Sequence, residues 1–439
     1  MRVLFVCADF PWPTNGGGRV RALAQLRLLA SLPEVEAVTL FTLSEDAIDA
    51  PARAALAAAI PKLRVLDPVF HPIHLFRHPR YVPRVAWLRL RGVPYLAGKW
   101  ESAAVRGSLE RVLGDERFDV VWLNSLGLAR YLEIVRRRQP QARVVLDGHN
   151  VESEIWRQFA ESRSGLAARV ARAEWRRARR FERGALRAAD AVAAISPDDA
   201  RAYRDLADVD ATFVPQVVTF TRRQDAGVAA GRFCYVGTLS WRPNVRGLDW
   251  FCDRVWPRVR ERLPDATLDI AGSGLPTDPN GSPVVPPSWR APGVRMLGFV
   301  PELDALYAPC AALVAPHLEG TGVRMKLLEA FRGGIPVVTT PPGASGLAIT
   351  PGREALVESD PDRFADVLVA IASDTVQQRR LRDAAYVYLE RAHGLESAQV
   401  AVRAVLACAG ERATNAARRG APDRSPRMPL VFPDSRTRG

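Results

Sequence analysis

Residues 319–330 read EGTGVRMKLLEA, and a short apolar run, AALVA, precedes them at residues 311–315. The apolar run has the length and composition of a buried parallel strand. Apolar residues at helical spacing then predict a helix over residues 325–332, and the pair Gly333-Gly334 is a typical helix end. A strand, a glycine-containing loop and a helix thus follow one another, which is the repeating unit of an α/β domain.

The head of this helix combines groups that suit an anionic ligand. Arg324 and Lys326 fall at its start and Glu329 comes one turn later, behind the loop residues Thr321 and Gly322. Helix N–H groups and cations would meet a diphosphate, and a carboxylate would accept hydrogen bonds from ribose hydroxyls. Lys326 is one of three lysines among 61 basic residues, which favours this interpretation slightly. The alternative is an ordinary capped helix with solvated charges.

Strand-like and helix-like segments alternate on both sides of this unit. Helices are expected at residues 19–31, 128–138 and 245–263. Strands are predicted at residues 2–7, 37–42, 118–123, 143–147, 191–195, 212–214, 232–236, 267–271, 294–297 and 335–339, and those at 118–123 and 143–147 are expected to be buried. The pattern restarts after residues 215–231, so we expect two doubly wound α/β domains in tandem.

Two further motifs follow predicted N-terminal strands. Gly16, Gly17 and Gly18 stand at the head of a helix, where N–H groups attract anions, although a dinucleotide fingerprint would place them closer to the strand. Residues 147–152 (DGHNVE) follow a strand at the edge where open α/β sheets bind ligands, and His149 would donate there to a sugar hydroxyl or a phosphate. The alternatives are an unoccupied turn and a helix cap, respectively.

The composition excludes several classes of protein. The chain has 439 residues, 48% hydrophobic and 25% charged, which is typical of a globular protein that buries a core without disulfides. No run approaches the ~18 apolar residues of a membrane span, and the first apolar run is too short for a signal peptide, so a cytoplasmic protein is expected. Five scattered cysteines and six histidines show no metal-binding spacing, and no metal is expected. The net charge of +13 favours an anionic partner.

The order and spacing of these segments resemble those of GT-B glycosyltransferases of the large retaining family 4, also called group 1. The similarity runs from residue 1 to about residue 410. It is carried by PWPTNGG at 11–17, DGHNVE at 147–152, RFE at 180–182, ADAV at 189–192 with Ser196, VG at 236–237 with Pro243 and Asn244, LDIAG at 268–272, KLLEA at 326–330 and GIPVV at 334–338.

The resemblance implies two Rossmann-like domains facing each other across a cleft, with the acceptor in the first and a nucleotide-sugar donor in the second. Such enzymes transfer a sugar with retention at the anomeric carbon, without a cofactor and generally without a metal. By position, Glu329 matches the glutamate that contacts the ribose, Gly16–Gly18 match the loop near the diphosphate, and His149 matches the histidine near the transferred sugar. The expected segments are an N-terminal domain at 1–215, a C-terminal domain at 216–395, a helix at 396–411 that can cross back to the first domain, and a disordered basic tail at 412–439.

The chain also departs from the usual pattern of the family. The usual glutamate pair would put its first member at Thr321, and Glu319 lies two residues earlier, so either residue is a candidate for the sugar contact. Thr238 and Asn244 replace an arginine and a lysine of the family. We expect Arg324 and Lys326 to supply that charge, and Arg242 is a second candidate. The expected catalytic residues are His149 and Glu319, and the expected donor-binding residues are Gly16, Gly17, Gly18, Gly237, Asn244, Thr321, Gly322, Arg324, Lys326 and Glu329.

Two basic segments bear on the acceptor. Residues 68–100 contain no acid and interleave arginines with aromatic residues, among them Arg77, Arg80 and Trp87. Residues 163–187 carry nine arginines on an expected helix. Arginine beside interfacial aromatics suits an anionic lipid headgroup, and a solvated face over an ordinary core is the alternative. Arg77, Arg80 and Trp87 are therefore the expected acceptor or membrane contacts.

We expect an enzyme that moves a sugar from a nucleotide sugar to a lipid-linked or cell-surface polysaccharide acceptor, peripherally at the inner face of the cell membrane. The main alternative is a non-catalytic GT-B scaffold or partner of a polysaccharide assembly system, because the first motif glutamate is missing. An epimerase or phosphorylase of this fold is less favoured, since neither the carboxylate set nor a cofactor lysine is evident. Specific nucleic-acid binding is suggested by charge alone, and no recognition motif supports it.

Overall fold

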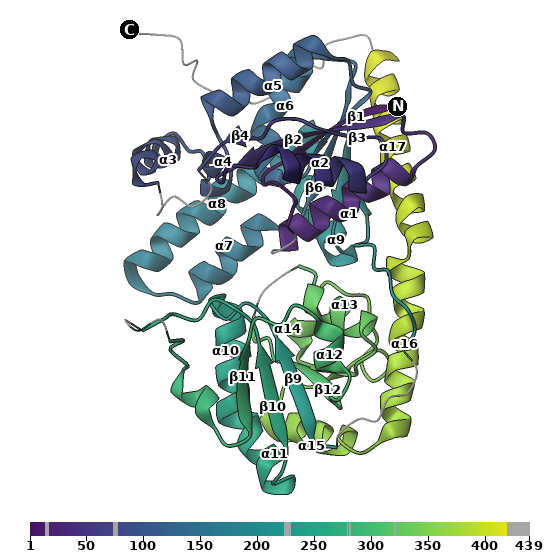
Figure 1. Ribbon diagram of the computed structural model, residues 1–439. Coiled ribbons are helices and arrows are strands. Elements are labelled where there is room, and N and C mark those ends of the chain that lie inside the picture. Colours follow the sequence, from purple (N-terminus) through teal and green to yellow (C-terminus); the bar gives the residue numbers. More distant parts are fainter. Residues whose placement is uncertain are drawn as a thin grey trace.

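The computed structural model describes residues 1–13, 17–72, 78–223, 230–278, 280, 282–319 and 322–418. Its two halves each contain a parallel sheet, and Figure 1 shows one half above the other. This is the α/β architecture that the sequence predicts. Within the described part of the chain, no helix is long and apolar enough to cross a membrane.

The N-terminal sheet has the strand order β3-β2-β1-β5-β6-β7-β8, with β4 paired to the end of β2. All its pairings are parallel. Its strands are β1 (Arg2–Cys7), β2 (Ala37–Ser44), β3 (Leu63–Val65), β4 (Val69–Phe70), β5 (Val120–Leu123), β6 (Arg143–Gly148), β7 (Ala191–Ala194) and β8 (Ala211–Phe213). The N-terminal helices are α1 (Gly17–Ser31), α2 (Ala50–Ala59), η1 (Pro79–Tyr81), α3 (Val82–Leu90), α4 (Tyr95–Lys99), α5 (Ala103–Asp115), η2 (Leu126–Tyr131), α6 (Leu132–Arg138), α7 (Glu152–Glu161), α8 (Gly165–Ala188) and α9 (Pro197–Ala207).

Apolar strands are needed here because both faces of the sheet are covered. On β1, Val3 and Phe5 pack into a core shared with Leu26 of α1. Leu4 and Val6 face the opposite way, into a core shared with Leu109 of α5. Near-continuous hydrophobic runs therefore mark these strands in the sequence.

The C-terminal sheet is also parallel, in the order β11-β10-β9-β12-β13-β14. Its strands are β9 (Arg232–Val236), β10 (Thr267–Ala271), β11 (Val294–Gly298), β12 (Ala312–Ala315), β13 (Val337–Thr339) and β14 (Leu356–Val357). The helices of this half are α10 (Arg242–Trp250), η3 (Phe251–Val255), α11 (Trp256–Arg262), η4 (Pro287–Arg290), α12 (Leu303–Tyr307), α13 (Met325–Arg332), α14 (Pro341–Ala344), α15 (Pro361–Ile371) and α16 (Thr375–His393).

One expected helix is interrupted. The sequence predicts a single helix over residues 245–263, but α10 and α11 are separated by the wide π-helical turn η3. Pro257 is the physical reason, because proline has no N–H to donate and its ring clashes with the preceding turn. The helix therefore restarts at Trp256, with Pro257 in its first turn.

The last helix, α17 (Leu395–Arg418), returns from the C-terminal half to the N-terminal one. Figure 1 shows α16 and α17 running along one side of both halves. Ala398, Val402 and Val405 of α17 are buried in the same core as Val3 and Phe5. The helix extends past residue 411, where the sequence analysis ends it, while residues 419–439 lie outside the described chain.

The two halves touch where their sheets end. Gly322 has a φ of +82°, and a side chain there would collide with the Asn150 side chain, which follows β6. The Gly346 N–H donates to Asp198 Oδ2 of α9 at 3.2 Å. The segment around His149 and the loop before α13 are therefore neighbours, although 170 residues separate them.

Candidate functional site

Lys326, in the first turn of α13, contacts residues from two other elements of the C-terminal half. Its Nζ donates to Asn244 Oδ1 at 3.1 Å and to Tyr235 Oη at 3.3 Å, and it lies 4.5 Å from the centre of the Tyr235 ring. A Cβ on Gly237 would lie 3.0 Å from both Lys326 Nζ and Asn244 Nδ2. Three predicted donor residues, Gly237, Asn244 and Lys326, therefore meet at the end of β9.

The Lys326 amine is only partly charged near neutral pH. Burial and, to a smaller extent, the neighbouring Arg324 together lower its pKa to about 7. No carboxylate lies within ion-pair distance of Lys326 in the described part of the structure. An anion in this position would restore the charged form of the amine, because opposite charges stabilise each other most strongly away from bulk water.

His317 was not singled out in the sequence, although it follows the predicted strand β12. It is buried, and burial together with Lys326 and Arg324 lowers its pKa to about 3. The imidazole is therefore neutral at physiological pH and adds no charge beside the two cations. Its position after β12 is the signal by which sequence reasoning would find it.

Gly247 explains how α10 approaches this site. A Cβ at Gly247 would overlap the carbonyl oxygen of Pro316, so only glycine lets the helix lie against the chain after β12. That approach brings Arg246 within 2.7 Å of Glu319 Oε2. The candidate catalytic residue Glu319 is thus held in an ion pair with α10.

Arg324 and Glu329, the other two charged residues predicted at the head of this helix, each have partners within the C-terminal half. Arg324 directly precedes the helix and donates from Nη2 to the backbone oxygens of Glu319 and Pro342, each at 3.4 Å. Glu329 pairs with Arg332 one turn along the helix, at 2.7 Å. A ribose at Glu329 would have to share this carboxylate with Arg332.

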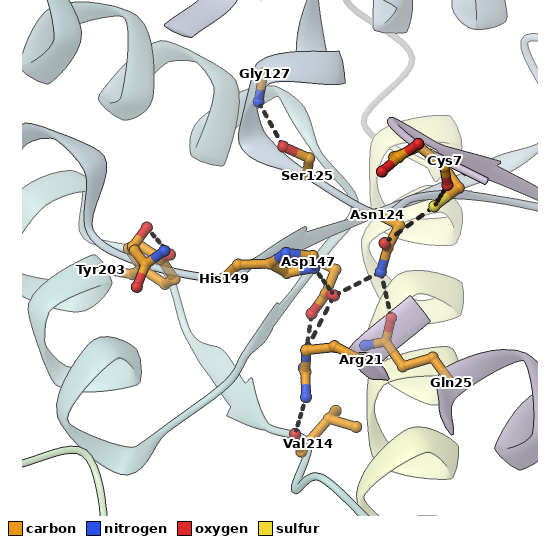
Figure 2. A network of polar contacts seen from close by, with 12 residues as sticks. Cys7, Arg21, Gln25, Asn124, Ser125, Gly127, Asp147, His149, Tyr203 and Val214 are labelled. Atoms are coloured by element: carbon orange, nitrogen blue, oxygen red, sulfur yellow. Dashed lines mark hydrogen bonds and ion pairs between the residues drawn. The ribbon is translucent and has the colours of Figure 1, made fainter. Parts of the chain in front are cut away.

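In the N-terminal half, His149 belongs to a buried polar network at the end of β6. Figure 2 shows Asp147 between His149, Arg21 and Asn124. The Nε2 of His149 lies 2.9 Å from Asp147 Oδ2, and Arg21 Nη2 lies 2.8 Å from Asp147 Oδ1. Burial alone would raise the pKa of Asp147, but Arg21 and His149 hold it well below the usual range. Asp147 is therefore a carboxylate at any working pH.

Gly17 and Gly18 form the first turn of α1, and nothing lies within 4 Å of a Cβ built on either. The next residue, Arg19, is paired with Asp9 at 2.6 Å. The head of α1 therefore has open backbone beside an ion pair. Gly16, Thr321 and Arg77, and the side chain of Arg80, lie outside the described residues.

Trp87 is on α3, away from the residues above, and 47% of it is exposed. The guanidinium of Arg91 lies over its ring at 4.0 Å. The adjacent Arg89 ties α3 to the buried Glu174 of α8 at 3.0 Å. Trp87 is thus a surface residue on a helix anchored to α8.

Sequence reasoning also missed a group of charges near His149. Burial and the like charge of Glu182 raise the pKa of Glu152 to about 7. The carboxylate of Glu182 accepts the N–H groups of Glu152 and Ser153 at 2.9 and 3.2 Å, which caps α7. Lys99 acts on Glu152 as an opposing charge, and burial lowers the pKa of Lys99. Isolated charges in three distant segments give no sequence signal for this arrangement.

Part of the chain is similar in sequence to known proteins. Residues 230–374 match the sequence profile of a family described as glycosyl transferases group 1. An uncharacterised 44.6 kDa protein in the cps region of Klebsiella pneumoniae is 25% identical over 158 residues, which span 36% of this chain and 41% of that protein.

Solved structures share the fold over nearly the whole chain. Alr3699/HepE of Anabaena in complex with UDP has 14% identity and a TM-score of 0.61, over 93% of this chain and 100% of that one. Sucrose-phosphate synthase from Thermosynechococcus elongatus has 15% identity and a TM-score of 0.64, over 93% and 98%. The chain therefore has the GT-B fold, and its residues 230–374 match the group 1 glycosyltransferase profile.

Proposed function

We propose that the protein transfers a sugar from a nucleotide-sugar donor to an acceptor, with retention of the anomeric configuration. The observation that carries the proposal is Lys326, a half-buried amine without a carboxylate partner in the described structure, at the head of a helix and at the carboxyl edge of a parallel sheet. A diphosphate would supply the missing negative charge. HepE of Anabaena is described in complex with UDP and with UDP-glucose, so a uridine nucleotide is the first donor to try.

The cations Arg324 and Lys326 would also stabilise the diphosphate leaving group. When the sugar departs, negative charge develops on the diphosphate, and fixed positive charges stabilise it best where water is excluded. Arg324 and Lys326 would supply that stabilisation from one helix end, together with the N–H groups of the first turn. We therefore propose transfer that requires neither a divalent metal nor another cofactor.

For the acceptor, we propose a glycan or lipid-linked sugar met at an anionic membrane surface. Large apolar side chains are exposed on α3, α7 and α8, which project on the same side of the N-terminal half in Figure 1. Arg91 and Arg163 stack on two exposed aromatic rings of this surface, Trp87 and Phe159. Arginine beside interfacial aromatics suits anionic headgroups. The exposed apolar side chains of these helices are Val82, Trp87, Leu90, Ile155, Phe159, Leu166 and Val170.

A second candidate function is a non-catalytic scaffold. It is favoured by one observation: the two candidate glutamates are already paired with arginines, Glu319 with Arg246 and Glu329 with Arg332. A protein that has lost transfer would still keep the fold. An assay for hydrolysis or transfer of the bound donor distinguishes the two functions. The enzyme converts the donor, whereas a scaffold leaves it unchanged.

The test is a thermal-shift screen of the purified protein against UDP-, GDP-, ADP- and dTDP-sugars, each with and without EDTA. A ligand that binds only the folded state adds roughly 2.7 kcal/mol at a hundred times its Kd. The proposal predicts stabilisation by one nucleotide class, unchanged by EDTA. Product NMR with the selected donor then reports the anomeric configuration. The absence of stabilisation by all four classes, or an inverted product, would contradict the proposal.

A further inference from the structure

A fully buried carboxylate, Asp147, lies next to His149 and has no contact with solvent. It accepts hydrogen bonds from three sides. Arg21 donates from Nη2 at 2.8 Å and from Nε at 3.3 Å, Asn124 donates from Nδ2 at 3.0 Å, and His149 approaches with Nε2 at 2.9 Å. The three donors come from α1, the end of β5 and the end of β6.

This geometry determines which nitrogen of His149 carries the proton. An ionised carboxylate has only acceptor sites, so His149 must present an N–H to it. That N–H is on Nε2, the nitrogen 2.9 Å away. The other nitrogen, Nδ1, has no hydrogen-bond partner among the described residues. In the neutral ring, Nδ1 is therefore an acceptor available to a ligand.

Arg21 keeps this arrangement in place. Its side chain is as deeply buried as that of Asp147, and its Nη1 donates to the carbonyl oxygen of Val214 at 3.0 Å, where the chain leaves the N-terminal half. Asn124 also donates to Gln25 of α1. Two residues of α1 thus hold the network, so the helix that begins with Gly17-Gly18 is fixed to the same carboxylate as His149.

We infer that Asp147 is a positioning residue: its carboxylate binds Nε2–H of His149 and thereby presents Nδ1 to the acceptor hydroxyl or the transferred sugar. The inference rests on the proposed function, because it assigns His149 to a sugar contact. Asp147 itself is buried and touches no substrate. Its effect is on the tautomer and orientation of the ring, which decide whether the ring accepts or donates a hydrogen bond.

The direct test is NMR of the wild-type protein labelled with ¹⁵N-histidine. Two-bond ¹⁵N–¹H correlations distinguish the two neutral tautomers, and the spectrum of His149→Gln identifies the His149 signals. We expect that, in the neutral ring of His149, Nε2 carries the proton and Nδ1 carries none. An Nδ1–H tautomer would overturn the inference. This readout requires no turnover, so it stays informative even if no donor is transferred.

A pair of matched variants tests the consequence for catalysis. Asp147→Asn keeps the size of the side chain but adds an amide N–H₂, which competes with the donors already present. We expect kcat to fall tenfold or more, with the KM for the donor within a factor of about three. Asp190→Asn is the control, because Asp190 is also paired with an arginine but lies at the start of β7. Equal kcat values in the two folded variants would overturn the inference; if Asp147→Asn does not fold, the tautomer of the wild type decides.

Discussion

At the scale of single residues, the lowered pKa of Lys326 makes anion binding by its amine depend on pH. Burial lowers its pKa to about 7 from an ordinary value of 10.5, so near neutral pH the amine is only partly charged. A bound diphosphate favours the charged form and raises this pKa. Below pH 7 the amine is already charged, whereas above pH 7 binding must take up a proton.

Donor binding should therefore weaken as the pH rises. We expect the affinity for UDP-glucose to be nearly constant below pH 6.5 and to fall from pH 7 to 9, by at most about tenfold per unit. Calorimetry in buffers of different ionisation enthalpy should show proton uptake at pH 8. Lys326→Met is the control and should bind weakly without this dependence. An affinity that is flat or rises over this range in the wild type would contradict the role of Lys326.

Glu152 makes a prediction about stability. Its pKa is raised to about 7 from 4.5 by burial and by Glu182, so the folded state holds a proton that the unfolded state releases. The free energy of unfolding should therefore decrease between pH 4.5 and 7. Between pH 5 and 8 the wild type should lose on the order of 2 kcal/mol of its free energy of unfolding, and Glu152→Gln should not show this loss. Urea unfolding at both pH values measures the difference.

The control for this measurement lies on the same helix. Glu154 pairs with Arg157, and that hydrogen bond lowers its pKa, so its charge does not change between pH 5 and 8. Glu154→Gln should keep the wild-type slope of stability against pH. The interpretation of Glu152 fails if both variants have the same slope.

At the scale of elements, the donor site depends on the close approach of α10 to the chain after β12. Gly247 permits it, because a side chain there would overlap the Pro316 carbonyl oxygen. Gly247→Ala should lower the free energy of unfolding by about 1–3 kcal/mol, despite the better helix propensity of alanine, and should weaken donor binding. Chemical unfolding and calorimetry measure the two effects.

A second helical glycine provides the matched control. Gly107 lies within α5, and nothing is within 4 Å of a Cβ at that position. Gly107→Ala should therefore raise stability by up to about 1 kcal/mol through helix propensity and leave donor binding unchanged. If Gly247→Ala also stabilises the protein, the contact with Pro316 does not restrict α10.

The sequence predicts most of the helices and strands, but it does not predict which residues of different elements contact one another. The apolar runs of β1, β9 and β10 match the predicted ranges because strands buried on both faces must be hydrophobic. The apolar spacing predicts an unbroken helix over residues 245–263, because that spacing takes no account of Pro257. The contact between Lys326 and Asn244 joins residues 82 positions apart, and no local pattern encodes it.

The same limit applies to the N-terminal part of the candidate site. His149 was predicted from its place after a strand, but its link to Arg21 through Asp147 spans 126 residues. Such pairs form only when parallel strands bring their carboxyl ends to one edge. Sequence reasoning therefore identified the edge and several of its residues, and the structure supplied their partners.

At the scale of the whole molecule, the exposed apolar side chains of α3 should bind membranes. Leu90 is 86% exposed and Trp87 is 47% exposed, so polar replacements there should not affect folding. The double change Trp87→Ser and Leu90→Ser should reduce sedimentation with phosphatidylglycerol-containing vesicles at low salt by severalfold. Val376→Ser, at another exposed apolar site on α16, should have no effect. Equal sedimentation of all three proteins would contradict a membrane role for α3.

The central claim is that the head of α13 binds the diphosphate of a nucleotide sugar, and calorimetry with UDP-glucose at pH 6.5 tests it most directly. The proteins are the wild type, Lys326→Met and Arg262→Met, the last removing a surface charge paired with Asp366. We predict that Lys326→Met lowers affinity ten- to a hundredfold, the loss of roughly 1.5–3 kcal/mol expected for a charge-assisted contact, and that Arg262→Met binds like the wild type. Equal affinity of Lys326→Met and the wild type would contradict the account.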